Sequence, residues 1–180
     1  KNLSYLPVVS GLATGVVTDV NGAGVGQLGD TTVVGSVSQT GVNGFNFGYT
    51  SQANKFGGAI VIPSAGSELN LSVNPAVFQV TGVSRIVLSV SDDKVVGTNP
   101  DGSNRYRSVN ILYDLTTGSF VIVNKATLLS IAADFNVSKI TSVSFVADKN
   151  IVPAVSGTVT VVTKNLSYLP VVSGLATGVV

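Results

Sequence analysis

The chain has 180 residues, enough for one domain with its own core, and 44% of them are apolar while only 11% are charged. Ordinary soluble domains carry about 25% charged residues, so this surface must be built from Ser, Thr, Asn and Gly, and the Val, Ile and Phe content excludes a disordered chain. The net charge is +1 without a basic cluster, which excludes a nucleic-acid partner, and no apolar run approaches the roughly 18 residues that membrane insertion requires.

The chain contains no Cys, Met, Trp or His. The nucleophile and base pairs that most enzymes use therefore cannot be assembled. A glycoside hydrolase needs only two carboxyl groups, and Glu68, Asp92, Asp93 and Asp114 exist, but their sequence context singles out no pair. We expect no enzymatic activity. A sheet protein without redox-sensitive side chains suits an extracellular or cell-surface location in a prokaryote.

Both ends of the chain carry the same segment, KNLSYLPVVSGLATGVV, at residues 1–17 and 164–180. The offset is 164 − 1 = 163 residues, and composition cannot produce such an identity. Either the parent protein is a tandem array with this period, or the segment was copied so that a polymerising subunit could complete itself. The second copy follows Thr163 without a Gly/Ser linker, which favours the array. The predicted units are a seam segment at 1–17, a β-sandwich repeat unit at 18–163 and the second seam copy at 164–180.

The centre of the seam segment is apolar and β-prone, with a Pro that fits an edge strand. A strand at this position can pair with the unit before or after it, so the expected partners are head-to-tail copies of the same chain. The predicted inter-unit residues are Tyr5, Leu6, Val8, Val9, Tyr168, Leu169, Val171 and Val172. Because one sandwich has a single position for this strand, we expect only one of the two copies to form part of the sandwich. The copy at 164–180 is favoured because it continues directly from a predicted strand. The alternative is a plain linker.

Between the two copies, short strand signals alternate with Gly, Asn, Asp and Ser, as in all-β folds. The predicted strands are 15–20, 31–38, 43–50, 58–62, 68–73, 76–80, 84–91, 107–115, 118–124, 139–147 and 156–163. In 84–91, Ile86, Leu88 and Val90 face one way and their neighbours the other. The residues Val109, Ile111 and Tyr113 repeat this alternation. Each strand therefore has a core face and a wetter face, which predicts two packed sheets.

The connections also carry signals. A short loop with Gly118 predicts a hairpin over 107–124. Asn124 can cap a short helix over 125–133. Two long polar or Gly-rich loops are predicted at 20–30 and 92–105, and any function besides scaffolding is expected there.

From Gly58 to Thr163, five stretches follow one another in a characteristic order. They are SELNLSV (67–73), SRIVLSVSD (84–92), YRSVNILYDLTTGSFVIV (106–123), SKITSVSFVAD (138–148) and SGTVTVV (156–162). This order resembles the galactose-binding-like superfamily, which includes many carbohydrate-binding modules. The resemblance implies an all-β, antiparallel two-sheet β-sandwich, jelly-roll-like, with one short helix. It also implies glycan binding, although the Tyr and Phe residues mostly fall at core-parity positions.

Five Asp and Asn side chains gather within thirteen positions. They are Asp92, Asp93, Asn99, Asp101 and Asn104. Calcium takes six to eight oxygen ligands, so this stretch is a candidate calcium site, although it lacks the closing Glu of an EF-hand loop. The alternative is a polar turn in which Asp and Asn bond their own backbone. No other cofactor is expected.

Three functions remain open from the sequence. The leading hypothesis is a structural repeat module of an extracellular adhesin, filament or sheath. The first alternative is a glycan-binding module of a surface array. The second is a fibre subunit joined by donated strands.

Overall fold

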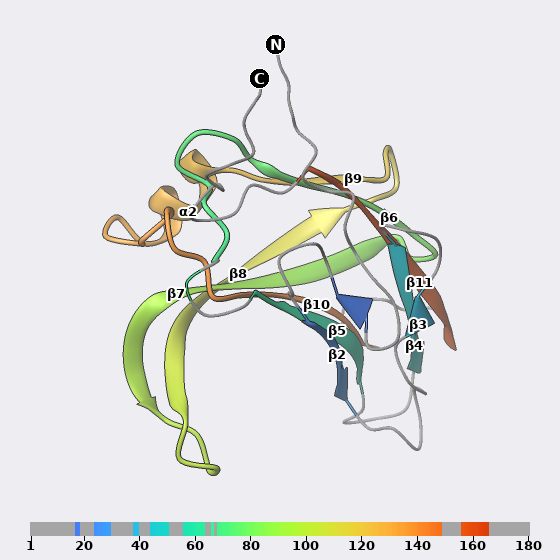
Figure 1. Ribbon diagram of the computed structural model, residues 1–180. Helices are drawn as coiled ribbons and strands as arrows, with labels where there is room; N and C mark the ends of the chain where they lie inside the picture. The colour runs from blue at the N-terminus through green and yellow to red at the C-terminus, as the bar shows by residue number, and fades with distance from the viewer. Residues whose placement is uncertain are drawn as a thin grey trace.

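The structure, a computed structural model, describes residues 17–18, 24–29, 38–39, 44–50, 56–63, 66, 68–148 and 156–165. Its strands are β1 (Val17–Thr18), β2 (Gly24–Gly29), β3 (Ser38–Gln39), β4 (Gly44–Thr50), β5 (Phe56–Ile62), β6 (Ala76–Thr81), β7 (Arg85–Thr98), β8 (Asn104–Asp114), β9 (Phe120–Val123), β10 (Ser142–Asp148) and β11 (Ser156–Asn165), and its helix is α2 (Lys125–Ile131). A six-stranded sheet runs β1-β2-β5-β10-β7-β8 and a five-stranded sheet runs β3-β4-β11-β6-β9. Figure 1 shows the two sheets packed as layers.

All pairs in both sheets are antiparallel. From β4 onward successive strands alternate between the sheets, apart from the neighbours β7 and β8. This crossing pattern confirms the predicted jelly-roll-like β-sandwich with one short helix.

The core lies between the sheets and is centred on three Phe rings. Phe145 on β10 meets Phe45 on β4 at a centroid distance of 5.8 Å and Phe78 on β6 at 4.9 Å, both edge to face. The ring from the six-stranded sheet thus contacts two rings from the other sheet. This is the offset geometry that aromatic quadrupoles prefer.

The predicted alternation in β7 and β8 is confirmed. Three β7 side chains, Ile86, Leu88 and Val90, are fully buried. They stand opposite Tyr113, Ile111 and Val109 of β8, respectively. The period of two in the sequence therefore assigned these strands their core face correctly.

The predicted helix is confirmed and ends two residues before the expected Ala133. The side chain of Asn124 accepts a hydrogen bond from the Thr127 N–H at 2.9 Å, and Leu128 is buried against the core. Within the described part of the chain, no helix has the length and apolar character needed to cross a membrane.

Two predictions in the first half of the domain are wrong. The Gly-rich stretch 20–30, predicted as a loop, contains β2, which pairs with β1 and β5. Pairing on both sides supplies the backbone hydrogen bonds, so the segment needs no β-prone side chains. The predicted strand 68–73 contains only an isolated bridge between Leu69 and Ile140. Most of the predicted strand 31–38 lies outside the described residues.

The predicted hairpin over 107–124 is also wrong. Strand β8 pairs with β7, whereas β9 pairs with β6 in the other sheet. The Asp114 side chain accepts hydrogen bonds from the N–H and hydroxyl of Thr116, at 2.9 and 2.6 Å. The same turn can connect two strands of one hairpin or two strands in different sheets. The residues of the loop therefore could not distinguish the two connections.

The predicted loop 92–105 is mostly strand. β7 continues to Thr98 and β8 begins at Asn104, so the two form a long hairpin. Figure 1 shows it bending away from the five-stranded sheet. Ser91 opposes Ser108 and Val95 opposes Tyr106, so β7 holds two extra residues and bulges there. Bulges bend a strand, which accounts for the curvature.

Gly82 combines a left-handed backbone with a close contact to a neighbouring strand. Gly82 has φ +98°, and a Cβ there would stand 2.1 Å from the Thr158 carbonyl oxygen. Gly102 has φ +89° with nothing within 4 Å of such an atom. We expect Gly82→Ala to lower the free energy of unfolding by about 2–5 kcal/mol and Gly102→Ala by about 1–2 kcal/mol in urea titrations. Equal losses would contradict the close approach.

Candidate functional site

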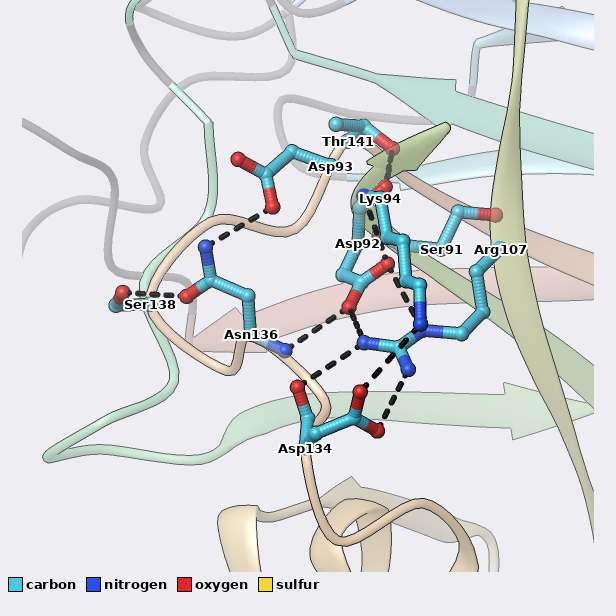
Figure 2. A network of polar contacts seen from close by, with 9 residues as sticks. All are labelled: Ser91, Asp92, Asp93, Lys94, Arg107, Asp134, Asn136, Ser138 and Thr141. Atoms are coloured by element: carbon cyan, nitrogen blue, oxygen red, sulfur yellow. Dashed lines mark hydrogen bonds and ion pairs between the residues drawn. The ribbon is translucent and has the colours of Figure 1, made fainter. Parts of the chain in front are cut away.

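A polar network occupies the base of the β7–β8 hairpin, with Asp92 at its centre (Figure 2). Asp92 is 0% exposed. Its Oδ1 accepts from Arg107 Nε at 3.3 Å and the Lys94 N–H at 3.1 Å, and its Oδ2 accepts from Arg107 Nη2 and the Asn136 N–H, the latter at 2.9 Å. Each carboxylate oxygen therefore has two donors.

These contacts set the charge of Asp92. Burial alone would raise the pKa of Asp92, but the hydrogen bonds from Arg107 and from the N–H groups of Asn136 and Lys94 outweigh it and hold the pKa below its usual 3.8. The same hydrogen bond to Asp92 is the main cause of the raised pKa of Arg107. The pair is therefore fully ionised at neutral pH.

Arg107 links this carboxylate to the loop after the helix. Its Nη1 donates to Asp134 Oδ1 at 2.7 Å and its Nη2 to the Asp134 carbonyl at 3.1 Å. Its guanidinium carbon lies 5.2 Å from the centroid of the Phe135 ring. The hydrogen bond from Arg107 lowers the pKa of Asp134.

Asn136 and Thr141 bind the same loop to the bulge of β7. Asn136 Nδ2 donates to Asp93 Oδ1 at 3.0 Å. Thr141 donates its N–H to the Ser91 carbonyl at 2.8 Å and its hydroxyl to the Asp92 carbonyl at 2.9 Å. Each carboxylate oxygen of Asp92 already accepts two hydrogen bonds from the protein, so the network stabilises the bulge of β7 and leaves no free acceptor on Asp92 for a substrate.

The structure divides the five predicted calcium ligands into two groups. Asp92 and Asp93 belong to the network, whereas the other three lie at the hairpin tip, roughly 20 Å of strand away. There, Asn99 Nδ2 donates to Ser103 Oγ and the Asn104 carbonyl, both at 3.0 Å. Asp101 Oδ1 accepts from the N–H and hydroxyl of Ser103, which lower the pKa of Asp101.

In this arrangement the five residues do not fit one ion. The ranges that the structure describes contain no group of three His, Cys, Asp or Glu side chains suited to a metal. A calcium ion held by part of the set stays a prediction. Melting curves in calcium and in EDTA check it: a rise in Tm of a few degrees that Asp101→Asn abolishes would support a tip site, and superposable curves would remove it.

The remaining candidate acids lie elsewhere. Asp114 bonds Thr116, and those hydrogen bonds lower the pKa of Asp114. Glu68 is buried, and its Oε2 accepts from the Gly66 N–H at 3.0 Å. Its Oε1 has no hydrogen-bond partner among the described residues. The eight predicted inter-unit residues, from Tyr5 to Val9 and from Tyr168 to Val172, lie outside the described residues.

A second candidate site is the outward face of the six-stranded sheet. Across β10, β7 and β8 its rows are Ser144–Ser89–Asn110 and Val146–Val87–Leu112. Hydroxyl and amide groups thus alternate with aliphatic side chains, and none of the six is charged.

An aromatic ring extends this outward face along the hairpin. Tyr106 is 37% exposed and shares its side of β8 with the exposed Ser108 and Asn110. Sequence reasoning had placed most Tyr and Phe side chains in the core, and the exposed Tyr106 and Phe120 are exceptions. The parity of β8 was the signal that could have identified Tyr106, but the strand was predicted to start only at residue 107.

No family model and no curated protein matches the chain by sequence. Among solved structures it is similar to the family 11 carbohydrate-binding module from Clostridium thermocellum in complex with a β-1,3-1,4-mixed-linked tetrasaccharide (TM-score 0.46, 15% identity, 81% of this chain and 83% of that one). A second similar structure is the family 11 module of the cellulosomal cellulase Lic26A-Cel5E of the same organism (TM-score 0.44, 14% identity, 81% and 82%). The chain also matches PfGH50B (TM-score 0.44, 14% identity), covering 78% of itself but only 22% of that protein.

At these identities the likeness concerns the fold alone. The jelly-roll-like β-sandwich is the architecture that the sequence pattern predicted, and the sheet order shows it independently.

Proposed function

We propose that this chain is a non-catalytic module that binds neutral glycan chains on the outward face of its six-stranded sheet. The observation that carries the proposal is the composition of that face. Ser89 and Asn110 present a hydroxyl and an amide group in one row, in which Ser144 is only 9% exposed, and Val87 and Leu112 present aliphatic groups in the next.

A sugar ring has the complementary chemistry. Its hydroxyl groups donate and accept hydrogen bonds, and its C–H groups form apolar patches that pack on aliphatic and aromatic side chains. Tyr106 adds an exposed ring on the same side of β8. The two rows named above carry no charge, and the row that follows them on β7 and β8 pairs Arg85 with Asp114, whose charges are opposite. A neutral chain is therefore favoured over an acidic one.

Two of the four candidate acids, Asp92 and Asp114, support a role without catalysis. Asp92 is saturated by Arg107 and two backbone N–H groups, and Asp114 bonds Thr116. A glycoside hydrolase needs two carboxyl groups free to flank a substrate bond. Each of these two carboxylates instead stabilises a local turn or bulge.

Affinity electrophoresis against neutral and acidic polysaccharides tests the proposal. We expect retardation by at least one neutral polysaccharide, and a loss of affinity of about three- to tenfold for Tyr106→Ala and for Asn110→Ala. Thr81→Ala, an exposed position on the other sheet, is the matched control and should bind as the parent does. Failure to bind any glycan, or equal losses in all three variants, would refute the glycan-binding face.

A second candidate function, a structural repeat unit of an extracellular adhesin, filament or sheath, is favoured by a separate observation. Strand β11 continues past Thr163 to Lys164 and Asn165, the first two residues of the second seam copy, with a shift in its register against β6 between Thr163 and Asn165. Because the seam segment begins within a strand of the sandwich, consecutive units would be joined without a flexible linker between them. Glycan binding and this role are compatible in one array.

The mass of the natural product distinguishes the array from a fibre of donated strands. An array unit is expected in a denatured protein of several 163-residue periods, and a donor-strand subunit in a protein with a single period. Labelling of intact cells with antibodies tests the extracellular location.

A further inference from the structure

The outward face of the five-stranded sheet carries an exposed apolar area at its β9 edge, which we call the β9 patch. It consists of Val77 on β6, Phe120 and Ile122 on β9, and Val162 on β11. Phe120 is 55% exposed and Ile122 47%. Val77 stands opposite Ile122, while Gln79 lies between Phe120 and Val162. Phe120, Ile122 and Val77 are therefore neighbours, Val162 lies diagonally next to Val77, and none of the four side chains is charged.

The neighbouring polar groups are already engaged. Gln79 Nε2 donates to Ser119 Oγ at 3.3 Å, and the Ile122 carbonyl accepts from the Tyr113 hydroxyl at 3.0 Å. Exposed aromatic and branched side chains that gather in this way generally mark a docking surface.

The chain leaves β11 beside this patch. Asn165 stands opposite Val77, whose other cross-strand neighbour is Ile122. Two strand spacings, about 10 Å, therefore separate Asn165 from Ile122. The next seven residues, 166–172, read LSYLPVV and span up to roughly 23 Å when extended. They have both the reach and the apolar side chains to cover the patch.

We propose that residues 166–172 of the second seam copy dock on the β9 patch of their own chain. The occupant is an intramolecular segment because the exit point, the length and the apolar composition match the patch. The first seam copy is identical in sequence but enters the fold at β1, on the edge of the other sheet. The inference does not depend on glycan binding.

A double-mutant cycle with the melting temperature as readout tests the docking. We expect Leu166→Ser with Leu169→Ser to lower Tm by roughly 4–8 °C in the parent chain. In a chain that already carries Phe120→Ser with Ile122→Ser, the same pair should lower Tm by less than about 2 °C. The matched control is Leu3→Ser with Leu6→Ser in the first copy, which should shift Tm equally in both backgrounds.

Limited chymotrypsin digestion gives a second readout that needs no stable patch variant. The sequences around Tyr5 and Tyr168 are identical, so any difference in cleavage rate reports only their surroundings. We expect cleavage after Tyr168 to be at least about tenfold slower than after Tyr5 in the parent chain. In the Phe120→Ser, Ile122→Ser chain the two rates should converge.

Three results would overturn the proposal. The first is that the Tm shifts of the patch and second-copy variants are additive and that cleavage after Tyr5 and Tyr168 is equally fast. The second is that the patch variants couple to the first copy instead of the second. The third is that the coupling grows with protein concentration. The last result would identify a second molecule as the occupant. Glycan affinity serves as an independent check, since the patch lies on the sheet opposite the proposed binding face and its variants should bind as the parent does.

Discussion

Replacing Arg107 with Ala is expected to lower the free energy of unfolding by about 3–5 kcal/mol, because it leaves the fully buried Asp92 carboxylate without its charged partner. The substitution also removes the hydrogen bonds to Asp134 that hold the loop after the helix. Urea titration monitored by circular dichroism measures the loss. Lys94→Ala is the control, because its ion pair with Asp134 spans 3.5 Å between exposed groups and should contribute under about 1 kcal/mol.

The pH dependence of stability gives a second test of the same pair. The pKa of Asp92 is lowered on folding, so its contribution is fully present above the unfolded pKa of about 3.9 and is lost as pH falls through the lower folded value. We expect Asp92→Asn to be less stable than the parent at neutral pH and the difference to shrink below about pH 4. A difference that stays constant down to pH 2 would show that the charge of Asp92 contributes nothing.

Phe145→Ala should reduce the free energy of unfolding by about 3–5 kcal/mol. The ring is fully buried and meets Phe45 and Phe78 from the opposite sheet, so its removal leaves a cavity where the two layers join. Leu112→Ala removes a side chain that is 56% exposed and is expected to change stability by under about 1 kcal/mol. Thermal and urea denaturation compare the two. Similar losses would contradict the assignment of Phe145 to the inter-sheet core.

Local signals were sufficient for much of the fold. The alternation around Ile86, Leu88 and Val90 assigned the core face of β7, because a strand turns successive side chains to opposite sides whatever its partners. Asn124 marked the helix start, because its side chain bonds an N–H only three residues away. Properties of this kind depend on neighbours in the sequence and can be read from it.

The candidate sites depend on residues that are distant in the sequence. Asp92 meets Arg107 across 15 positions and the Asn136 N–H across 44, and no spacing rule indicates either contact. Asp92 was predicted as one of five calcium ligands, because the sequence around a carboxylate does not show whether its partner is an ion or a guanidinium. The outward face that we propose for glycan binding likewise unites β10, β7 and β8, whose order in the sheet differs from their order in the chain.

The sequence by itself determined the class of fold, the core faces of its longer strands, the helix cap and the 163-residue spacing of the seam copies. The first two follow from the alternation of apolar and polar residues along each strand. The cap follows from a hydrogen bond between near neighbours, and the spacing from the identity of the two segments. Only the tertiary structure decided that the Gly-rich stretch at 24–29 is a strand, that 92–98 extends β7, and that β9 crosses to the other sheet. The physical reason is that a strand is stabilised by hydrogen bonds to a partner, and the partner's identity is settled by packing across the whole domain.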